Sequence, residues 1–86
     1  MPTLSMFFGI VIRINPREHN PPHFHAQFQD TEGSFDLATG EMTVGDLDKR
    51  QQRLVQAWWE IHHDELAANW RLIQAGEAYF KINPLQ

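Results

Sequence analysis

The stretch His19-Asn20-Pro21-Pro22-His23-Phe24-His25-Ala26 organises this chain of 86 residues and places three of its five histidines within a short segment. Proline has a fixed φ and pushes the residue before it into extended conformations. The two prolines therefore stiffen the approach to His23. Beyond them, Phe24 and Ala26 alternate with His23 and His25. This period of two predicts a strand from residue 23 or 24 to residue 29, with both imidazoles on one face.

Hydrophobic alternation also predicts a strand over residues 7–14, in which β-branched residues favour the extended conformation. Phe8, Ile10 and Ile12 would share its buried face. Gly9 would mark a bulge or a close approach of the backbone. Asn15-Pro16 would end this strand, because proline cannot donate a hydrogen bond to the sheet.

The residues after the histidine block predict a hairpin. Residues 30–33, Asp-Thr-Glu-Gly, have the composition of a loop, and residues 34–38 that of the next strand. A loop of this length would place Phe28 opposite Phe35, Ala26 opposite Leu37 and Gln27 opposite Asp36, with Asp36 diagonal to His25. Residues 42–44 predict a further short strand.

Apolar residues at helical spacing run from Leu47 to about Ala75. Asp46 or Asp48 would be the N-cap, and Gly76 the residue beyond the C-terminus. The spacing continues through residues 62–64 without glycine or proline, which favours one helix of about 40 Å. The alternative is a break near residue 63, with a second helix capped by Asp64. Residues 79–82 could add an edge strand.

These elements predict an α+β fold in a single domain over residues 1–86: a small antiparallel sheet of three to four strands packed against one long or broken C-terminal helix. The predicted core consists of Phe8, Ile10, Ile12, Phe24, Phe28, Phe35, Leu37, Leu54, Trp58, Ile61, Leu66 and Trp70.

Composition excludes several kinds of protein and of site. The chain has no cysteine, which rules out disulfide frameworks and thiolate metal sites. It has no window approaching 18 apolar residues and no signal-peptide pattern, so we expect a cytoplasmic protein without membrane association. The net charge of −4 argues against broad binding to nucleic-acid backbones and leaves local basic clusters open.

The histidine block allows three interpretations. The first is structural, with imidazoles bonded to the backbone or half-exposed on the sheet, and is favoured because small domains often hold such histidines. In the second, His19, His23 and His25 bind a divalent metal ion such as zinc and leave a coordination position open. Asp36 would then be a fourth ligand or would orient a histidine N–H. In the third, the histidines act without metal in acid–base chemistry or anion binding.

A basic cluster lies in the first turns of the predicted helix, where cations oppose the helix macrodipole. It consists of Lys49, Arg50 and Arg53. Either Asp46 and Asp48 compensate locally, or an anion binds at the helix N-terminus with Arg50 and Arg53 as donors.

Two aromatic positions of the helix bear on partners. Trp59 lies off the apolar stripe and would be either an exposed interface anchor or covered by a wide stripe. An anchor there would favour a homodimer or a tight protein partner. His62 lies on the stripe, which predicts a hydrogen-bonded core histidine, whereas His63 is expected to be exposed.

Several segments resemble those of a bacterial domain-of-unknown-function family of short proteins with the signature H-N-P-P-H-F-H-A. The opening Met-Pro-Thr-Leu-Ser-Met-Phe-Phe-Gly-Ile-Val-Ile, the block at 19–26 and the helical Trp58…His62…Glu65-Leu66…Asn69-Trp70 are similar. His19, Pro21, Pro22, His23 and His25 match the signature positions. The resemblance implies a place in two-gene operons, some labelled toxin–antitoxin pairs, and brings no catalytic residue. Relatives often carry an aromatic pair where this chain has residues 14–18, so no aromatic role is carried over.

Three functional hypotheses follow. The first, favoured by small size and by the resemblance, is an interaction or regulatory protein, one partner of a toxin–antitoxin-like two-gene module. Its partner would be an operon-encoded small protein or a second copy. The second is a metal-assisted hydrolase or nuclease that uses the histidine cluster, although no general-base glutamate is evident within the motif. The third is a small-anion-binding module.

Overall fold

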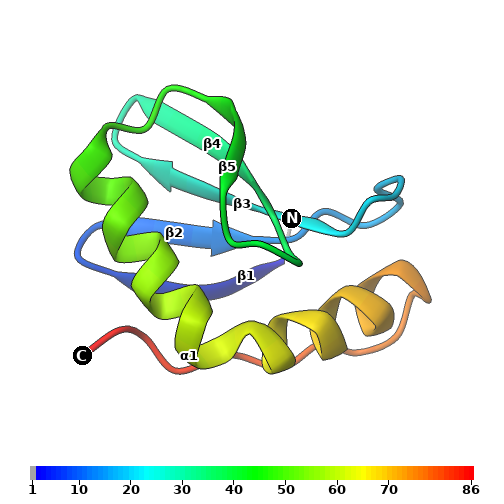
Figure 1. The fold of residues 1–86 in the computed structure, drawn as a ribbon. Helices are drawn as coiled ribbons and strands as arrows, with labels where there is room; N and C mark the ends of the chain where they lie inside the picture. The colour runs from blue at the N-terminus through cyan, green and yellow to red at the C-terminus, as the bar shows by residue number, and fades with distance from the viewer. Residues whose placement is uncertain (1) are drawn as a thin grey trace.

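The computed structural model describes residues 2–86 and contains five strands followed by one helix (Figure 1). The strands are β1 (Thr3–Phe7), β2 (Ile10–Arg13), β3 (His23–Phe28), β4 (Thr31–Asp36) and β5 (Met42–Gly45), and the helix is α1 (Lys49–Gln74). Every neighbouring pair of strands is antiparallel, in the order β1-β2-β3-β4-β5. The predicted α+β fold is confirmed, with one strand more than the sequence predicts.

The first hairpin corrects the strand predicted over residues 7–14. The chain turns at Phe8 and Gly9, whose φ angles are 49° and 79°, so the segment is split between β1 and β2. Two positive φ angles are typical of the tight turn that matches the twist of a hairpin. Phe8 therefore points outward and is 63% exposed, and its assignment to the core is wrong. A Cβ on Gly9 would lie 3.2 Å from the Phe28 ring, so the predicted close approach is present.

The second hairpin corrects the predicted register. Phe28 pairs with Thr31 rather than with Phe35, because a short turn at Gln29 and Asp30 replaces the predicted loop over residues 30–33. Gln29 has a φ of 53°, a conformation that the composition does not reveal. The shift in pairing is an even number of residues, so every side chain keeps its predicted face.

The helix follows its predicted limits closely. Asp48 is the N-cap and accepts a hydrogen bond from the Gln51 N–H, and Gly76 follows the C-terminus with a φ of 73°. No break occurs between residues 62 and 64, so one continuous helix is confirmed. Figure 1 shows that its axis bends in the middle, which lets both halves follow the sheet.

The helix and one face of the sheet enclose the core. Trp58 is completely buried, and its ring lies 5.4 Å from that of Phe7 and 6.2 Å from that of Phe24. Most of the predicted core is confirmed, including Ile10, Ile12, Phe24, Phe35, Leu37, Trp58, Leu66 and Trp70, while Phe28 and Leu54 are partly buried. Ile61 is 65% exposed, so its assignment was wrong. The bend of the helix turns this position out of the apolar stripe.

The C-terminal tail returns along the helix and forms no strand, which corrects the edge strand predicted at residues 79–82. Side chains of the helix hold it in place. Buried Asn69 donates to the Phe80 carbonyl at 2.9 Å and accepts from the Phe80 N–H at 3.0 Å. The Trp58 indole N–H donates to the Asn83 carbonyl at 2.8 Å. These bonds satisfy polar groups that the tail would otherwise bury without partners.

The opposite face of the sheet carries polar side chains, and the helix contacts it at His23, whose ring centroid lies 5.5 Å from that of Trp70. This outer face includes Met6, Val11, His25 and Val44. Each of them either alternates along its strand with buried residues or pairs with a residue on a neighbouring strand that alternates in this way. Among residues 2–86, no helix is long and apolar enough to cross a membrane.

Candidate functional site

Three side chains with metal-binding atoms converge at the start of β3. His23 and His25 project from the outer face of the strand, and Glu18 reaches them from the loop between β2 and β3. One ligand atom from each residue lies within 4.8 Å of the others. The paired imidazoles confirm the predicted strand face. We call these three residues the Glu18 triad.

The distances within the Glu18 triad suit a small divalent ion. His25 Nε2 lies 2.9 Å from one Glu18 carboxylate oxygen, and His23 Nε2 lies 3.2 Å from the other. Metal–ligand bonds of about 2.0–2.2 Å place neighbouring ligand atoms of a tetrahedral site roughly 3.3–3.6 Å apart. The three side chains are mostly buried, with 17–18% of each exposed. An ion would enter this cluster if the ligand atoms moved apart by a few tenths of an ångström.

The hydrogen-bond partners of the two imidazoles differ in a way that matters for chemistry. His23 Nδ1 lies 2.8 Å from the Pro21 carbonyl, which can only accept, so Nδ1 carries a proton. In the neutral ring, His23 Nε2 then presents a lone pair to a Glu18 oxygen. His25 Nδ1 faces the Ser34 hydroxyl at 3.2 Å, and this hydroxyl can donate. His25 Nε2 donates to the Glu18 carboxylate 2.9 Å away when it carries a proton, and it presents a lone pair to a cation when it does not.

Glu18 is held as an anion. Burial raises the pKa of its carboxyl, but hydrogen bonds with His25 and Asn15 and the positive charges of the two histidines lower it more, so the pKa lies below the ordinary value. The Asn15 amide donates to the carboxylate at 2.8 Å. The loop itself is tied to the end of the helix, where Gln74 donates to the Asn15 carbonyl at 2.9 Å. The sequence therefore builds a rigid, negatively charged ligand beside two imidazoles.

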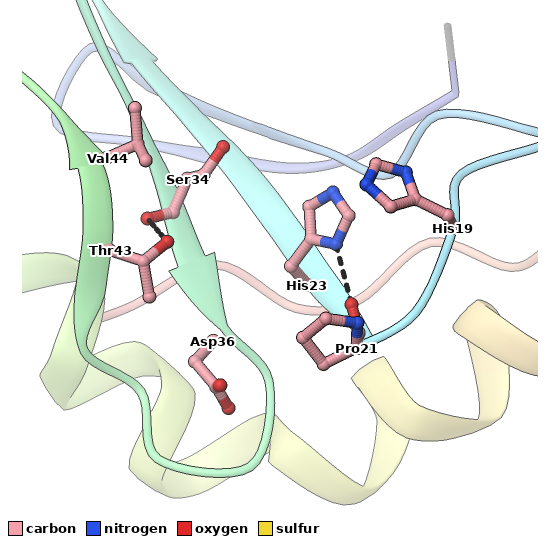
Figure 2. Close-up of a pocket in the computed structure, with 7 residues that line it drawn as sticks. All are labelled: His19, Pro21, His23, Ser34, Asp36, Thr43 and Val44. Atoms are coloured by element: carbon pink, nitrogen blue, oxygen red, sulfur yellow. Dashed lines mark hydrogen bonds between the residues drawn. The ribbon is translucent and has the colours of Figure 1, made fainter.

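A groove of about 210 Å³ opens beside His23 on the outer face. Figure 2 shows the His19 and His23 rings on one side and residues of β5 on the other. The lining residues are His19, Pro21, His23, Ser34, Asp36, Thr43 and Val44. The pairing of β4 with β5 shifts between Ser34 and Phe35, so Thr43 is an extra residue in the edge strand. Irregularities of this kind often re-aim side chains beside functional sites.

The structure separates the predicted site residues. His19 is exposed, with its ring centroid 6.3 Å from that of His23, and it lines the groove without joining the Glu18 triad. Asp36 pairs with His23 rather than with Gln27 and still lies diagonal to His25, as predicted, and its carboxylate accepts the N–H groups of Ala38 and Thr39.

The predicted basic donors lie apart from the histidines. Arg50 and Arg53 are exposed in the first turns of the helix, and neither lines a groove that contains a histidine of the block. Sequence reasoning missed Glu18, whose only signal is its place directly before His19 on a loop that must double back toward β3. Glu18 lies just outside the motif of residues 19–26, and its contact with His23 and His25 was not predicted.

Two helical predictions are resolved. His62 is mostly buried, contacts the Trp58 ring and lies 2.6 Å from a Glu65 carboxylate oxygen, so the hydrogen-bonded core histidine is confirmed. Trp59 is half-buried and donates to the Leu37 carbonyl at 2.8 Å. A wide apolar stripe, rather than an exposed anchor, explains this tryptophan.

Comparison with protein families matches residues 9–71 to the family described as Domain of unknown function (DUF4160). The matched region runs from the first hairpin through most of the helix and includes the whole Glu18 triad. Comparisons with curated proteins and with solved structures found no match. Because the match covers well over half of the chain, this protein belongs to the family of domains of unknown function DUF4160.

Proposed function

We propose that this protein binds one divalent transition-metal ion through Glu18, His23 and His25 and uses it to activate water for hydrolysis. Two imidazoles and one carboxylate form a ligand set found in catalytic zinc sites, where a further position stays open to water. Sites built from three protein ligands differ in this respect from closed structural sites.

The carrying observation is the contact between His23 and the Pro21 carbonyl. It places the proton of a neutral ring on Nδ1 and turns the lone pair of Nε2 toward a carboxylate oxygen 3.2 Å away. Two lone pairs facing each other repel, unless the ring is charged or a cation lies between them. A histidine that donates from one nitrogen to a backbone carbonyl and binds metal with the other is the usual arrangement in metal sites.

The surrounding residues have separate roles in this proposal. A bound divalent ion lowers the pKa of its water and supplies hydroxide near neutral pH. Ser34 and Asn15 orient His25 and Glu18 through the bonds described above. His19, which lines the groove with His23 and lies outside the triad, would be the residue available to accept a proton there.

The test is a zinc titration of metal-stripped protein, followed through the histidine ring signals by NMR. We expect saturable shifts of His23 and His25 together, while His62 and His63 remain unchanged as internal references. The zinc-loaded protein is then assayed with 4-nitrophenyl acetate, a neutral ester. Glu18→Ala should weaken zinc binding about 100-fold or more and reduce both responses accordingly at a given zinc concentration, and His63→Ala should alter neither. Hydrolysis that is unchanged in Glu18→Ala at that zinc concentration would refute the assignment.

A second proposal concerns a protein partner, as in the two-gene modules that the resemblance implies. It is supported by the outer face of the sheet, where Met6 and Val44 are 63% and 71% exposed, and by β5, which is the last strand of the sheet in residues 2–86. Exposed sheet edges are common sites of added strands. Co-purification with the product of the neighbouring gene, lost in Val44→Lys, would support it. A monomeric protein that does not bind the product of the neighbouring gene would contradict this second proposal.

A further inference from the structure

The hollows beside the Glu18 triad are lined by three residues with carboxylate side chains and by three histidines. A second hollow of about 340 Å³ adjoins the first and is lined by His25, Glu32, Gly33, Ser34, Val44, Gly45 and Asp46. The two hollows share Ser34 and Val44, so they flank one ridge between β4 and β5. Asp36 is the acidic residue that lines the first hollow, and Glu32 and Asp46 are the acidic residues that line the second. Among the described residues, neither hollow is lined by a lysine or an arginine.

Two of these carboxylates are fixed in the wall. Asp36 accepts N–H groups of the turn that follows β4. Asp46 accepts the Glu32 N–H at 2.9 Å, and its own N–H donates to the Glu32 carbonyl at 2.9 Å. The Glu32 side chain is exposed and lies next to His25 on the outer face, because Glu32 pairs with Gln27 and Ser34 with His25. The negative charge is thus part of the fold.

The nearest basic residue by strand pairing does not reach this side. Arg13 pairs with His25, but it lies on the β2 side of that histidine, away from β4. Its guanidinium donates to the Gln27 side chain at 2.7 Å. The environment of the triad is therefore asymmetric, with carboxylates toward β5 and one arginine toward β2.

We infer that the ligand of this site is a carbonyl compound with a neutral or cationic substituent, such as an amide or ester that carries an amine, and not a phosphate ester. This inference rests on the proposed function, because it concerns the molecule that reaches the metal ion from the groove. A carbonyl oxygen can coordinate the ion while its substituent lies along the β4–β5 hollows. An anionic substituent there would face three carboxylates, whereas an ammonium group would be attracted to them.

The size of the effect follows from Coulomb's law. A carboxylate about 8 Å from a charged substituent in a water-filled groove changes the affinity of the ligand roughly twofold. Three carboxylates therefore change the affinity about tenfold between a ligand with a neutral substituent and one with a charged substituent. The effect should shrink in salt, because exposed charges at this distance are screened at physiological ionic strength.

The test uses cobalt-loaded protein and three hydroxamates that share one chelating group. Glycine hydroxamate has a cationic amine, acetohydroxamic acid is neutral, and malonic monohydroxamate has an anionic carboxylate. The visible spectrum of cobalt reports binding to the ion. We expect the cationic compound to bind at least tenfold more tightly than the anionic one, with a ratio that falls as salt is added. Equal affinities, or an anionic preference, would overturn the inference.

Matched variants identify the groups responsible. Glu32→Gln removes one carboxylate of the hollow and should reduce the preference about twofold to fourfold, whereas Glu77→Gln removes an exposed carboxylate beyond the helix and should leave it unchanged. If the anionic compound binds best and Arg13→Gln abolishes that preference, the ligand is anionic and is held from the β2 side. A protein that binds no cobalt would refute the proposed metal site itself, so the two failures are distinguishable.

Discussion

Removal of the Glu18 carboxylate should eliminate stabilisation of the protein by zinc. A ligand that binds only the folded state adds about 2.7 kcal/mol to the free energy of unfolding at a concentration 100 times its Kd. For a domain of this size, each kcal/mol raises the melting temperature by about 4–8 °C. Zinc at that concentration should therefore raise the melting temperature of the wild-type protein by roughly 10–20 °C.

The geometry sets the expected loss in Glu18→Ala. The carboxylate provides one of three ligands and faces both imidazoles, at 2.9 and 3.2 Å. Mutation of a residue that merely supports a ligand weakens metal binding about 10–100-fold, so removal of the ligand itself should cost about 100-fold or more. At the same zinc concentration the stabilisation then falls to about 0.4 kcal/mol, or roughly 2–3 °C.

The assay is calorimetry or a thermal-shift measurement of metal-stripped protein with and without zinc, followed by a chelator to reverse the shift. Each variant is compared with its own metal-free form, so that any general loss of stability cancels. His63→Ala is the matched control, because His63 is half-exposed and contacts its neighbour Asp64 and the Trp59 ring instead of the Glu18 triad. A wild-type protein without a zinc-dependent shift would refute the metal site. A full shift in Glu18→Ala would refute the role of the carboxylate.

Three further predictions test single contacts. Ser34→Ala removes the hydroxyl beside His25 Nδ1 and should weaken zinc binding about tenfold with no change in fold, as measured by calorimetric titration. Phe8→Asn should change the free energy of unfolding in urea by less than about 1 kcal/mol, because asparagine tolerates the positive φ at this position. A decrease of about 3 kcal/mol would instead indicate that the Phe8 ring is buried. The lowered pKa of Glu18 means that the metal-free protein is stabilised by its carboxylate at neutral pH and loses this contribution as the pH falls through that pKa. The midpoint of urea unfolding should therefore fall less in Glu18→Gln than in the wild-type protein as the pH is lowered. Parallel curves of midpoint against pH for the two proteins would contradict the assignment.

Features that depend on neighbouring residues were predicted well. The N-cap at Asp48 and the helix limit at Gly76 follow from local backbone chemistry, and both are present. His23 and His25 share a face because a strand repeats every two residues, whatever its partner strand is. The partial burial of Trp59 needed the fold, because the carbonyl that its indole contacts lies in the turn after β4.

Features that depend on the path of the chain were missed. The β3–β4 register turns on a positive φ at Gln29, which glycine or asparagine would have signalled and glutamine does not. Phe8 occupies a turn for the same reason.

The local sequence thus determined the type and limits of most elements and the face on which the histidine pair lies. Only the tertiary structure decided that Glu18 joins this pair, because the loop between β2 and β3 folds back and is tied by Gln74 to the far end of the helix. Periodicity contains no information about such a return. The distance between a loop residue and a strand depends on contacts between segments far apart in the chain.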